Sequence, residues 1–102
     1  MGHLEHVVLL VVMRLREDAY GVPIGRAVQQ ATRRELAMAS VYAALERLEA
    51  KGFLASRLAD PTPERGGRAK RYFRVTAKGM AAARETRRAL TFLWRGLPEK
   101  TA

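Results

Sequence analysis

The sequence contains no cysteine, which excludes disulfides and thiolate metal sites from this chain of 102 residues. Its longest apolar run, Val7 to Met13, is far shorter than the ~20 residues that a membrane-spanning helix needs. No basic segment precedes this run and no small-residue cleavage site follows it, so a secretory signal is not expected. These absences predict a cytoplasmic protein without a membrane partner.

Catalytic groups are scarce as well. Ser40 and Ser56 are the only serines, and neither lies in a glycine elbow or has a histidine near it in sequence. The chain also lacks a phosphate-cradling glycine loop. His3 and His6 with Glu5 are too loosely spaced to predict a metal site, and no second group of ligands supports them. The sequence therefore predicts a protein that is not an enzyme and that has no cofactor.

Acidic residues are few, and the basic residues are concentrated. The chain has 19 Lys and Arg against 10 Asp and Glu, for a net charge of +9. Nine basic residues between Arg65 and Arg88 face one acid, Glu85, so this segment holds a net +8. So concentrated a positive field predicts a polyanionic partner. Duplex DNA, RNA and anionic lipid all meet that description, and composition alone does not choose among them.

Apolar periodicity predicts three helices in the first half of the chain, over residues 3–15, 23–33 and 39–51. The valines of the first segment are also typical of a buried strand, but its length and charged flanks favour a helix. Such an apolar helix needs cover on more than one face, which indicates a dimer interface. The second and third helices are short and amphipathic, with expected apolar stripes at Ile24, Ala27, Val28 and Ala31 and at Val41, Ala44, Leu45 and Leu48. A turn of about four residues lies between them, as in a helix-turn-helix.

Strand character follows over residues 53–59 and 69–76, around a segment with two prolines and two glycines. Phe53, Leu54 and Leu58 are the expected inward-facing groups of the first strand. A hairpin directly after a helix-turn-helix is the order of a winged helix. The predicted class is mainly α with a β-hairpin: a winged helix-turn-helix over residues 1–76, with a C-terminal dimerisation helix and tail over residues 77–102, in one compact unit.

Thr76 is the expected N-cap of the last helix, over residues 77–94. Its apolar positions follow a three-four spacing, and so small a domain leaves them nothing to pack against at the far end. A second copy of the chain is therefore expected to cover Leu90, Leu93, Trp94 and Leu97. Trp94 is either a packing anchor of this dimer or the wall of an effector pocket, and the two interpretations are compatible if the interface contains a cavity.

Four segments lie in the order and spacing of one known family: the apolar first helix ending at Leu15, Ala19-Tyr-Gly-Val-Pro-Ile24, Ser40-Val-Tyr-Ala-Ala-Leu-Glu-Arg-Leu-Glu-Ala-Lys-Gly52, and Gly66-Gly-Arg-Ala-Lys-Arg-Tyr-Phe-Arg-Val-Thr-Ala-Lys-Gly79. Through them the chain resembles the PadR-type transcriptional regulators, in the short subclass with a single C-terminal helix. One departure is Ala43, where many relatives have proline. The resemblance implies a winged-helix repressor that binds operator DNA as a homodimer through its terminal helices. It also implies that a small aromatic or lipophilic effector releases some members from DNA.

The third helix is expected to contact DNA through Ser40, Ala43 and Arg47, which lie opposite its apolar stripe, and also through Tyr42. Small residues near its start allow close approach to base edges, and its dipole favours phosphate. The resemblance implies that the Tyr42 hydroxyl contacts phosphate. The alternatives are that Ser40 only starts the helix, that Tyr42 lies at the core edge, and that Arg47 pairs with Glu46 or Glu49.

The hairpin is expected to contact DNA through the cations around its Gly66-Gly67 tip, namely Arg65, Arg68, Lys70 and Arg71. Arginine from such a loop can enter a narrow minor groove, whereas phosphate contacts add affinity with little sequence information. The alternative is a solvated run of charge. Arg26, Gln29 and Arg33 of the second helix are weaker candidates for backbone contacts.

These observations predict a homodimeric duplex-DNA-binding repressor on an inverted-repeat operator, with half-sites about 34 Å apart. One alternative is a basic RNA- or ribosome-associated winged-helix module that uses the same surface. Another is a protein-interaction domain with incidental charge, whose binding would change little with salt.

Overall fold

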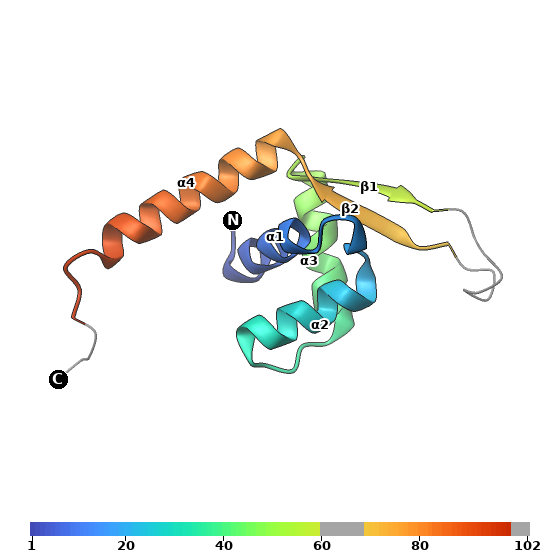
Figure 1. Cartoon of the computed structure of the whole chain (residues 1–102), viewed down its shortest axis with the longest axis horizontal. Coiled ribbons are helices and arrows are strands. Elements are labelled where there is room, and N and C mark those ends of the chain that lie inside the picture. Colours follow the sequence, from blue (N-terminus) through green and yellow to red (C-terminus); the bar gives the residue numbers. More distant parts are fainter. Residues whose placement is uncertain (60–68, 99–102) are drawn as a thin grey trace.

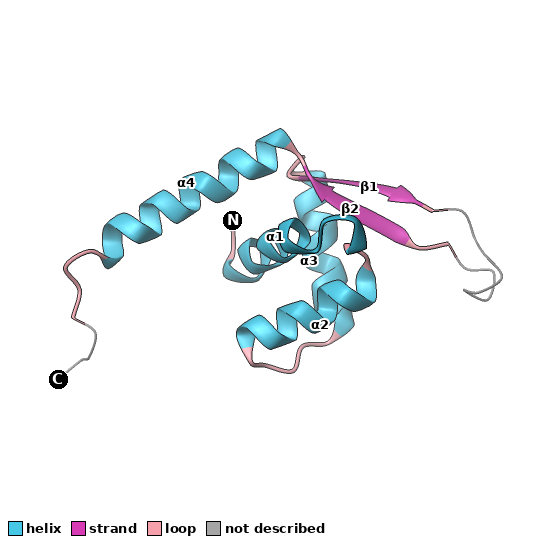
Figure 2. Cartoon of the chain, in the orientation of Figure 1, coloured by secondary structure: helices cyan, strands magenta, loops and turns pink. Residues whose placement is uncertain are grey.

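A computed structural model describes residues 1–59 and 69–98 of the chain. The elements follow in the order α1 (His3–Leu15), the 3-10 helix η1 (Arg16–Asp18), α2 (Gly21–Thr32), α3 (Met38–Ala50), β1 (Leu54–Leu58), β2 (Arg71–Val75) and α4 (Ala77–Trp94) (Figures 1 and 2). This confirms the predicted mainly helical class with one β-hairpin, and it confirms that the valine-rich first segment is a helix.

The core lies where α1 packs against α2 and α3. Leu9 of α1, Ile24 of α2 and Leu45 of α3 are completely buried, so each helix turns one apolar face inward. The predicted stripe of α3 is confirmed in full, because Val41, Ala44, Leu45 and Leu48 are all buried. On α2 the expected stripe is one residue too long, since Ala31 is exposed at the last turn of the helix.

The hairpin pairs β1 and β2 in antiparallel register, from Leu54 opposite Val75 to Leu58 opposite Arg71. Phe73 is buried against the helices. Leu58 was expected to face inward, but this is wrong: it is 60% exposed, because the hairpin has left the helical body by the end of β1 (Figure 1).

The chain just before α2 adds a very short third strand to this sheet. Tyr20 forms an isolated antiparallel bridge with Tyr72, and the backbone N–H of Phe73 donates to the carbonyl of Ala19 at 2.9 Å. The two tyrosine rings lie 5.2 Å apart at a tilt of 56°. The segment between η1 and α2 thus fixes β2 to the helical body.

Thr76 caps α4 as predicted. Its hydroxyl accepts a hydrogen bond from the Gly79 backbone N–H at 3.0 Å and donates one to the Gly52 carbonyl at 2.6 Å. The first half of α4 touches the body through Gly79 and Ala83, which are both buried. Beyond them α4 extends away from the core, on the opposite side from the hairpin (Figure 1). None of the described helices is long and apolar enough to cross a membrane.

Candidate nucleic-acid interface

The N-terminal half of α3 presents a surface of small residues. Ser40 is exposed and Ala43 half-buried, whereas Val41 and Leu45 on the other side of the helix are buried. The first N–H groups of a helix lack intrahelical acceptors and lie at its positive end. This part of α3 can therefore approach a base edge or a phosphate closely.

Tyr42 lies between α3 and the start of α2. The side chain packs so closely on Gly21, the first residue of α2, that any Cβ at position 21 would collide with the Tyr42 hydroxyl. Tyr42 is nevertheless 46% exposed. Packing at the core edge and contact with a ligand are thus compatible for this residue. The phenol places a hydroxyl beside a helix N-terminus, a combination that suits a phosphate.

Arg47 is held by α1. Its Nε donates to Glu5 Oε2 at 3.1 Å, and Lys51 Nζ donates to Glu5 Oε1 at 2.5 Å. The hydrogen bond from Lys51, followed by that from Arg47, lowers the pKa of Glu5 below its ordinary value, although burial acts in the opposite direction. Both bonds join α3 to a helix more than forty residues away in sequence.

The alternative in which Arg47 pairs with Glu46 or Glu49 is therefore wrong. Glu49 instead accepts a hydrogen bond from the Ser56 hydroxyl at 2.6 Å, and Glu46 has no bond to Arg47 among the described residues. Glu5 and Lys51 were not predicted as part of the surface. Their signal in the sequence is weak, because Glu5 is one carboxylate at the edge of an apolar helix.

The outer end of the two strands has internal contacts of its own. Lys70 Nζ lies 4.0 Å from the centre of the Tyr20 ring, a cation–π arrangement. Arg71 Nη1 donates to the Ser56 hydroxyl at 2.9 Å, which links it to Glu49. Lys70 is half-buried and Arg71 exposed. Two of the four predicted wing cations are thus oriented by the body, while Arg65 and Arg68 lie outside the described residues.

The outer face of the hairpin adds cations that were not predicted to bind. Arg57 lies over the Tyr72 ring at 5.0 Å. Arg74 pairs with Ala55, which is two residues before Arg57 in β1, so Arg74 lies on the same face of the hairpin. With Arg16 of η1 they line a groove of about 540 Å³. Strand alternation was the available signal, since it places Tyr72 and Arg74 on the face opposite Phe73.

On α2, Arg26 and Arg33 are both exposed. Arg33 ends the helix in a left-handed conformation, with φ of 55°. The neighbouring Gln29 donates from Nε2 to the Leu36 carbonyl at 3.2 Å and so closes the turn between α2 and α3. Arg33 lies at this turn, whereas Arg26 lies in the middle of α2, and both residues are exposed.

Comparison with known proteins identifies the family of this chain. The family model described as "Transcriptional regulator PadR-like family" matches residues 8–85, from α1 into α4. The chain belongs to the PadR-like family. Its members are transcriptional regulators rather than enzymes, so the chain is a DNA-binding transcription regulator, and the predicted resemblance is confirmed.

Solved structures agree with this assignment. A PadR family regulator from Eggerthella lenta is 29% identical, with a TM-score of 0.70 over 88% of this chain and 76% of that one. A regulator of the same family from Clostridium difficile is 25% identical, with a TM-score of 0.71 over 90% and 91% of the two chains. A PadR-like factor from Bacteroides fragilis, at 23% identity, shares the fold with a TM-score of 0.74 over 88% and 82%. No curated protein sequence matches the chain.

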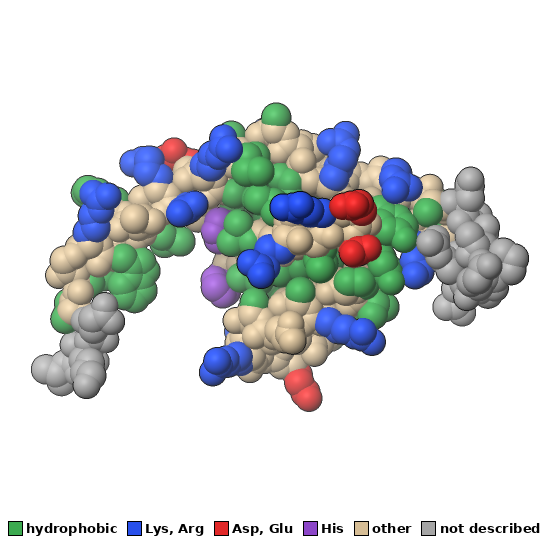
Figure 3. All heavy atoms as spheres, in the orientation of Figure 1, with side chains coloured by type: hydrophobic (Ala, Val, Ile, Leu, Met, Phe, Trp, Pro, Cys, Tyr) green, Lys and Arg blue, Asp and Glu red, His purple; other side chains and the backbone are tan. Residues whose placement is uncertain are grey.

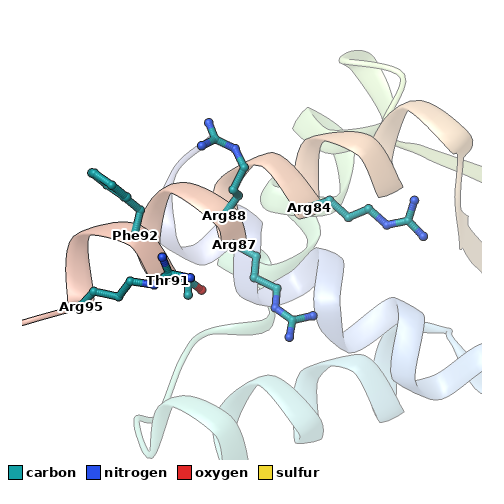
Figure 4. A pocket seen from close by; sticks show the side chains of 6 residues that line it. All are labelled: Arg84, Arg87, Arg88, Thr91, Phe92 and Arg95. Atoms are coloured by element: carbon teal, nitrogen blue, oxygen red, sulfur yellow. The ribbon is translucent and has the colours of Figure 1, made fainter.

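In this PadR-like chain the positive charge divides between two places. The sequence between Arg65 and Arg88 forms one basic segment. The later basic residues of this segment lie on α4, which extends away from the hairpin (Figures 1 and 3). Arg88 and Phe92 lie on one side of α4 and Arg87 on the other, as Figure 4 shows. Exposed arginines therefore follow α4 as well as the hairpin: Arg84, Arg87, Arg88 and Arg95.

The far end of α4 exposes large apolar side chains. Five of them are between 46% and 68% exposed: Leu90, Phe92, Leu93, Trp94 and Leu97. A groove of about 440 Å³ runs between α4 and α1, where Leu10, Met13 and Trp94 contribute to its lining. The far end of α4 thus leaves several large apolar side chains open to solvent, which is typical of an interaction site.

Proposed function

We propose that this PadR-like regulator is a repressor that binds an inverted-repeat operator as a homodimer. The observation that supports DNA readout most directly is the open, small-residue face of α3 beside the Tyr42 hydroxyl. In the proposed complex Ser40 and Ala43 approach base edges in the major groove, Arg47 reaches a base or phosphate, and Tyr42 donates to a phosphate at the start of α2.

The hairpin is proposed to supply affinity and orientation. Arg65 and Arg68 would contact phosphates or the minor groove, with Lys70 and Arg71 at the start of β2 held by Tyr20 and Ser56. Arg26 and Arg33 would contact the backbone beside α3. These contacts depend little on sequence, so selectivity comes mainly from α3.

The apolar end of α4 supports the homodimer. Leu90, Leu93, Trp94 and Leu97 would be buried against a second copy, because exposing them all is unfavourable in water. A two-fold axis then sets the two α3 helices one helical turn of DNA apart, about 34 Å. Bound at a promoter, such a dimer represses by excluding the polymerase.

The groove between α1 and α4 supports an effector site. Trp94 supplies an aromatic wall, and Leu10 and Met13 supply apolar surface for a small aromatic or lipophilic molecule. An effector there would act at the dimer interface, and so on the spacing of the two α3 helices.

The test begins with selection of duplexes from a random pool by the full chain. We expect an inverted repeat to be enriched, and its binding to resist competition by random-sequence RNA at fixed salt. If random RNA competes as well as the enriched duplex does, the repressor is ruled out in favour of an RNA-associated module. Binding that hardly changes between 50 and 200 mM salt would favour a protein-interaction domain, because neutralising several phosphates makes affinity fall steeply with salt.

A further inference from the structure

Glu5 is the most buried charged residue among those described, at 8% exposed, and it lies on α1 rather than on the proposed DNA-binding surface. Both of its oxygens accept hydrogen bonds from α3: one from Arg47 and one from Lys51. The side chains of Arg47 and Lys51 remain 51% and 43% exposed. One buried carboxylate therefore holds two cations that are open to a ligand.

The geometry leaves Arg47 ready to bind. Glu5 takes the Nε hydrogen, and a guanidinium has four further N–H donors on its outer nitrogens. Arg47 follows Ser40 by two helical turns, so both lie on the same side of α3. Because the guanidinium is planar, fixing its Nε also fixes the plane in which the outer donors point.

Glu5 also offsets charge. Without it, α3 would present two unpaired cations at its C-terminal half, and cations there attract phosphate whatever the base sequence. We propose that Glu5 is a positioning residue for DNA readout, which aims Arg47 at the operator and restrains Arg47 and Lys51 from indiscriminate phosphate contacts. This inference rests on the proposed function, since it assumes that α3 reads duplex DNA.

The experiment compares Glu5→Gln with Glu85→Gln. Glu85 is exposed on α4 and pairs with Arg88 at 2.6 Å, so its substitution changes the net charge equally without touching α3. Affinities are measured for the duplex enriched from the random pool and for a random duplex of the same length, between 50 and 200 mM salt. Circular dichroism verifies that each variant is folded.

For Glu5→Gln we expect the random duplex to bind about threefold more tightly at 50 mM salt, with a salt slope steeper by about 0.9, as for one added phosphate contact. The ratio of enriched to random affinity should fall roughly tenfold, as for one lost arginine–base contact. Adding Lys51→Gln should return random-duplex binding to the wild-type level but leave the ratio low. Glu85→Gln should keep the wild-type ratio.

Arg47→Lys supplies an independent test that keeps Glu5 and the charge. It should lower the same ratio while leaving random-duplex affinity unchanged, because lysine lacks the fixed fork of donors. Equal ratios in Glu5→Gln and Glu85→Gln, or a wild-type ratio in Arg47→Lys, would overturn the role of Glu5. If Glu5→Gln does not fold, Arg47→Lys decides alone. Failure of the wild-type chain to enrich any duplex would instead reject the proposed function.

Discussion

Thr76 is a single side chain that joins three parts of the molecule. Its hydroxyl caps α4 at Gly79 and binds the carbonyl of Gly52, in the turn after α3. We expect Thr76→Val, which keeps the shape and removes the hydroxyl, to lower the free energy of unfolding by about 1–2 kcal/mol. Urea denaturation measures this. Thr76→Ser should stay close to wild type, and a loss in Thr76→Ser without a loss in Thr76→Val would show that the methyl group matters instead.

His6 gives the fold a pH dependence. Its Nδ1 is buried and has no hydrogen-bond partner among the described residues, and burial, followed by the positive charges of His3 and the N-terminus, lowers the pKa of His6 from 6.5. The unfolded chain then binds a proton more readily, so stability falls as the pH drops below about 6.5. We expect His6→Gln to reduce the slope of the melting temperature against pH between pH 7 and pH 5.

The companion variant is His3→Gln, at an exposed position, which should weaken the slope less than His6→Gln does, because the charge of His3 is only a secondary cause of the lowered pKa of His6. Glu5 does not interfere in this window. Its pKa is lowered from 4.5, so its contribution is lost only as the pH falls below that value. A wild-type slope in His6→Gln would assign the acid sensitivity to another group.

Residues differ in how far the sequence alone predicts their contacts. Thr76 was predicted as a cap because capping depends on neighbours three residues away. The partner of Arg47 could not be predicted, since Glu5 reaches it only when α1 packs across α3. Tyr42 shows the same limit: its contact with Gly21 depends on how closely α2 and α3 approach each other.

At the scale of elements, the junction of α4 with the hairpin depends on Gly79. A Cβ at this position would collide with the backbone carbonyl of Phe53, which cannot move away as a flexible side chain can. Helix propensity alone predicts that Gly79→Ala gains nearly 1 kcal/mol, whereas the collision predicts a loss of about 1–3 kcal/mol. We expect the loss, measured by chemical denaturation. Gly2→Ala is the matched control, because a Cβ there would meet nothing closer than 3.8 Å.

A second prediction at this scale concerns the hairpin. We expect Arg68→Ala to weaken binding to all duplex sequences and to flatten the salt slope by about 0.9, as for one lost phosphate contact. Filter binding between 50 and 200 mM salt measures both quantities. Arg95→Ala, after the end of α4, removes the same charge and should leave the slope unchanged. An unaltered slope in Arg68→Ala would remove this residue from the DNA contacts.

The elements themselves were largely predictable. The helices and the hairpin follow local periodicity, and the predicted bounds of α4 match its observed bounds, Ala77–Trp94. The errors occur where an element leaves the body. Leu58 alternates as an inward residue should, but no helix lies over the end of β1 to bury it. The bridge of Tyr20 to Tyr72 was missed because one extended residue leaves no periodic signal.

For the whole molecule, the apolar end of α4 predicts the effect of Trp94→Ala. Trp94 is the largest of the exposed apolar side chains there, and loss of a buried interface tryptophan costs at least about 2 kcal/mol, or roughly 30-fold in the dimer dissociation constant. Sedimentation over a dilution series measures it, with Arg88→Ala as the control on the same helix. A dimer that survives dilution unchanged would contradict the role of Trp94 as an anchor.

The distribution of charge over the molecule was the hardest feature to predict. The sequence places nine basic residues between Arg65 and Arg88 and suggests a single field. The structure separates them because α4 leaves the hairpin in the opposite direction, and that direction depends on the packing of Gly79 and Ala83. Counts of charge therefore predicted the class of partner but not which cations act together.

The short third strand beside β2 affects the tendency of the protein to aggregate. A two-stranded ribbon normally offers two unpaired edges to other chains, and such edges nucleate intermolecular sheets. Here Ala19 and Tyr20 occupy part of the free side of β2, so within the described residues the continuous open edge belongs to β1. That edge is five residues long and includes Arg57. The hairpin is thus a poor template for amyloid-like stacking, even in concentrated solution.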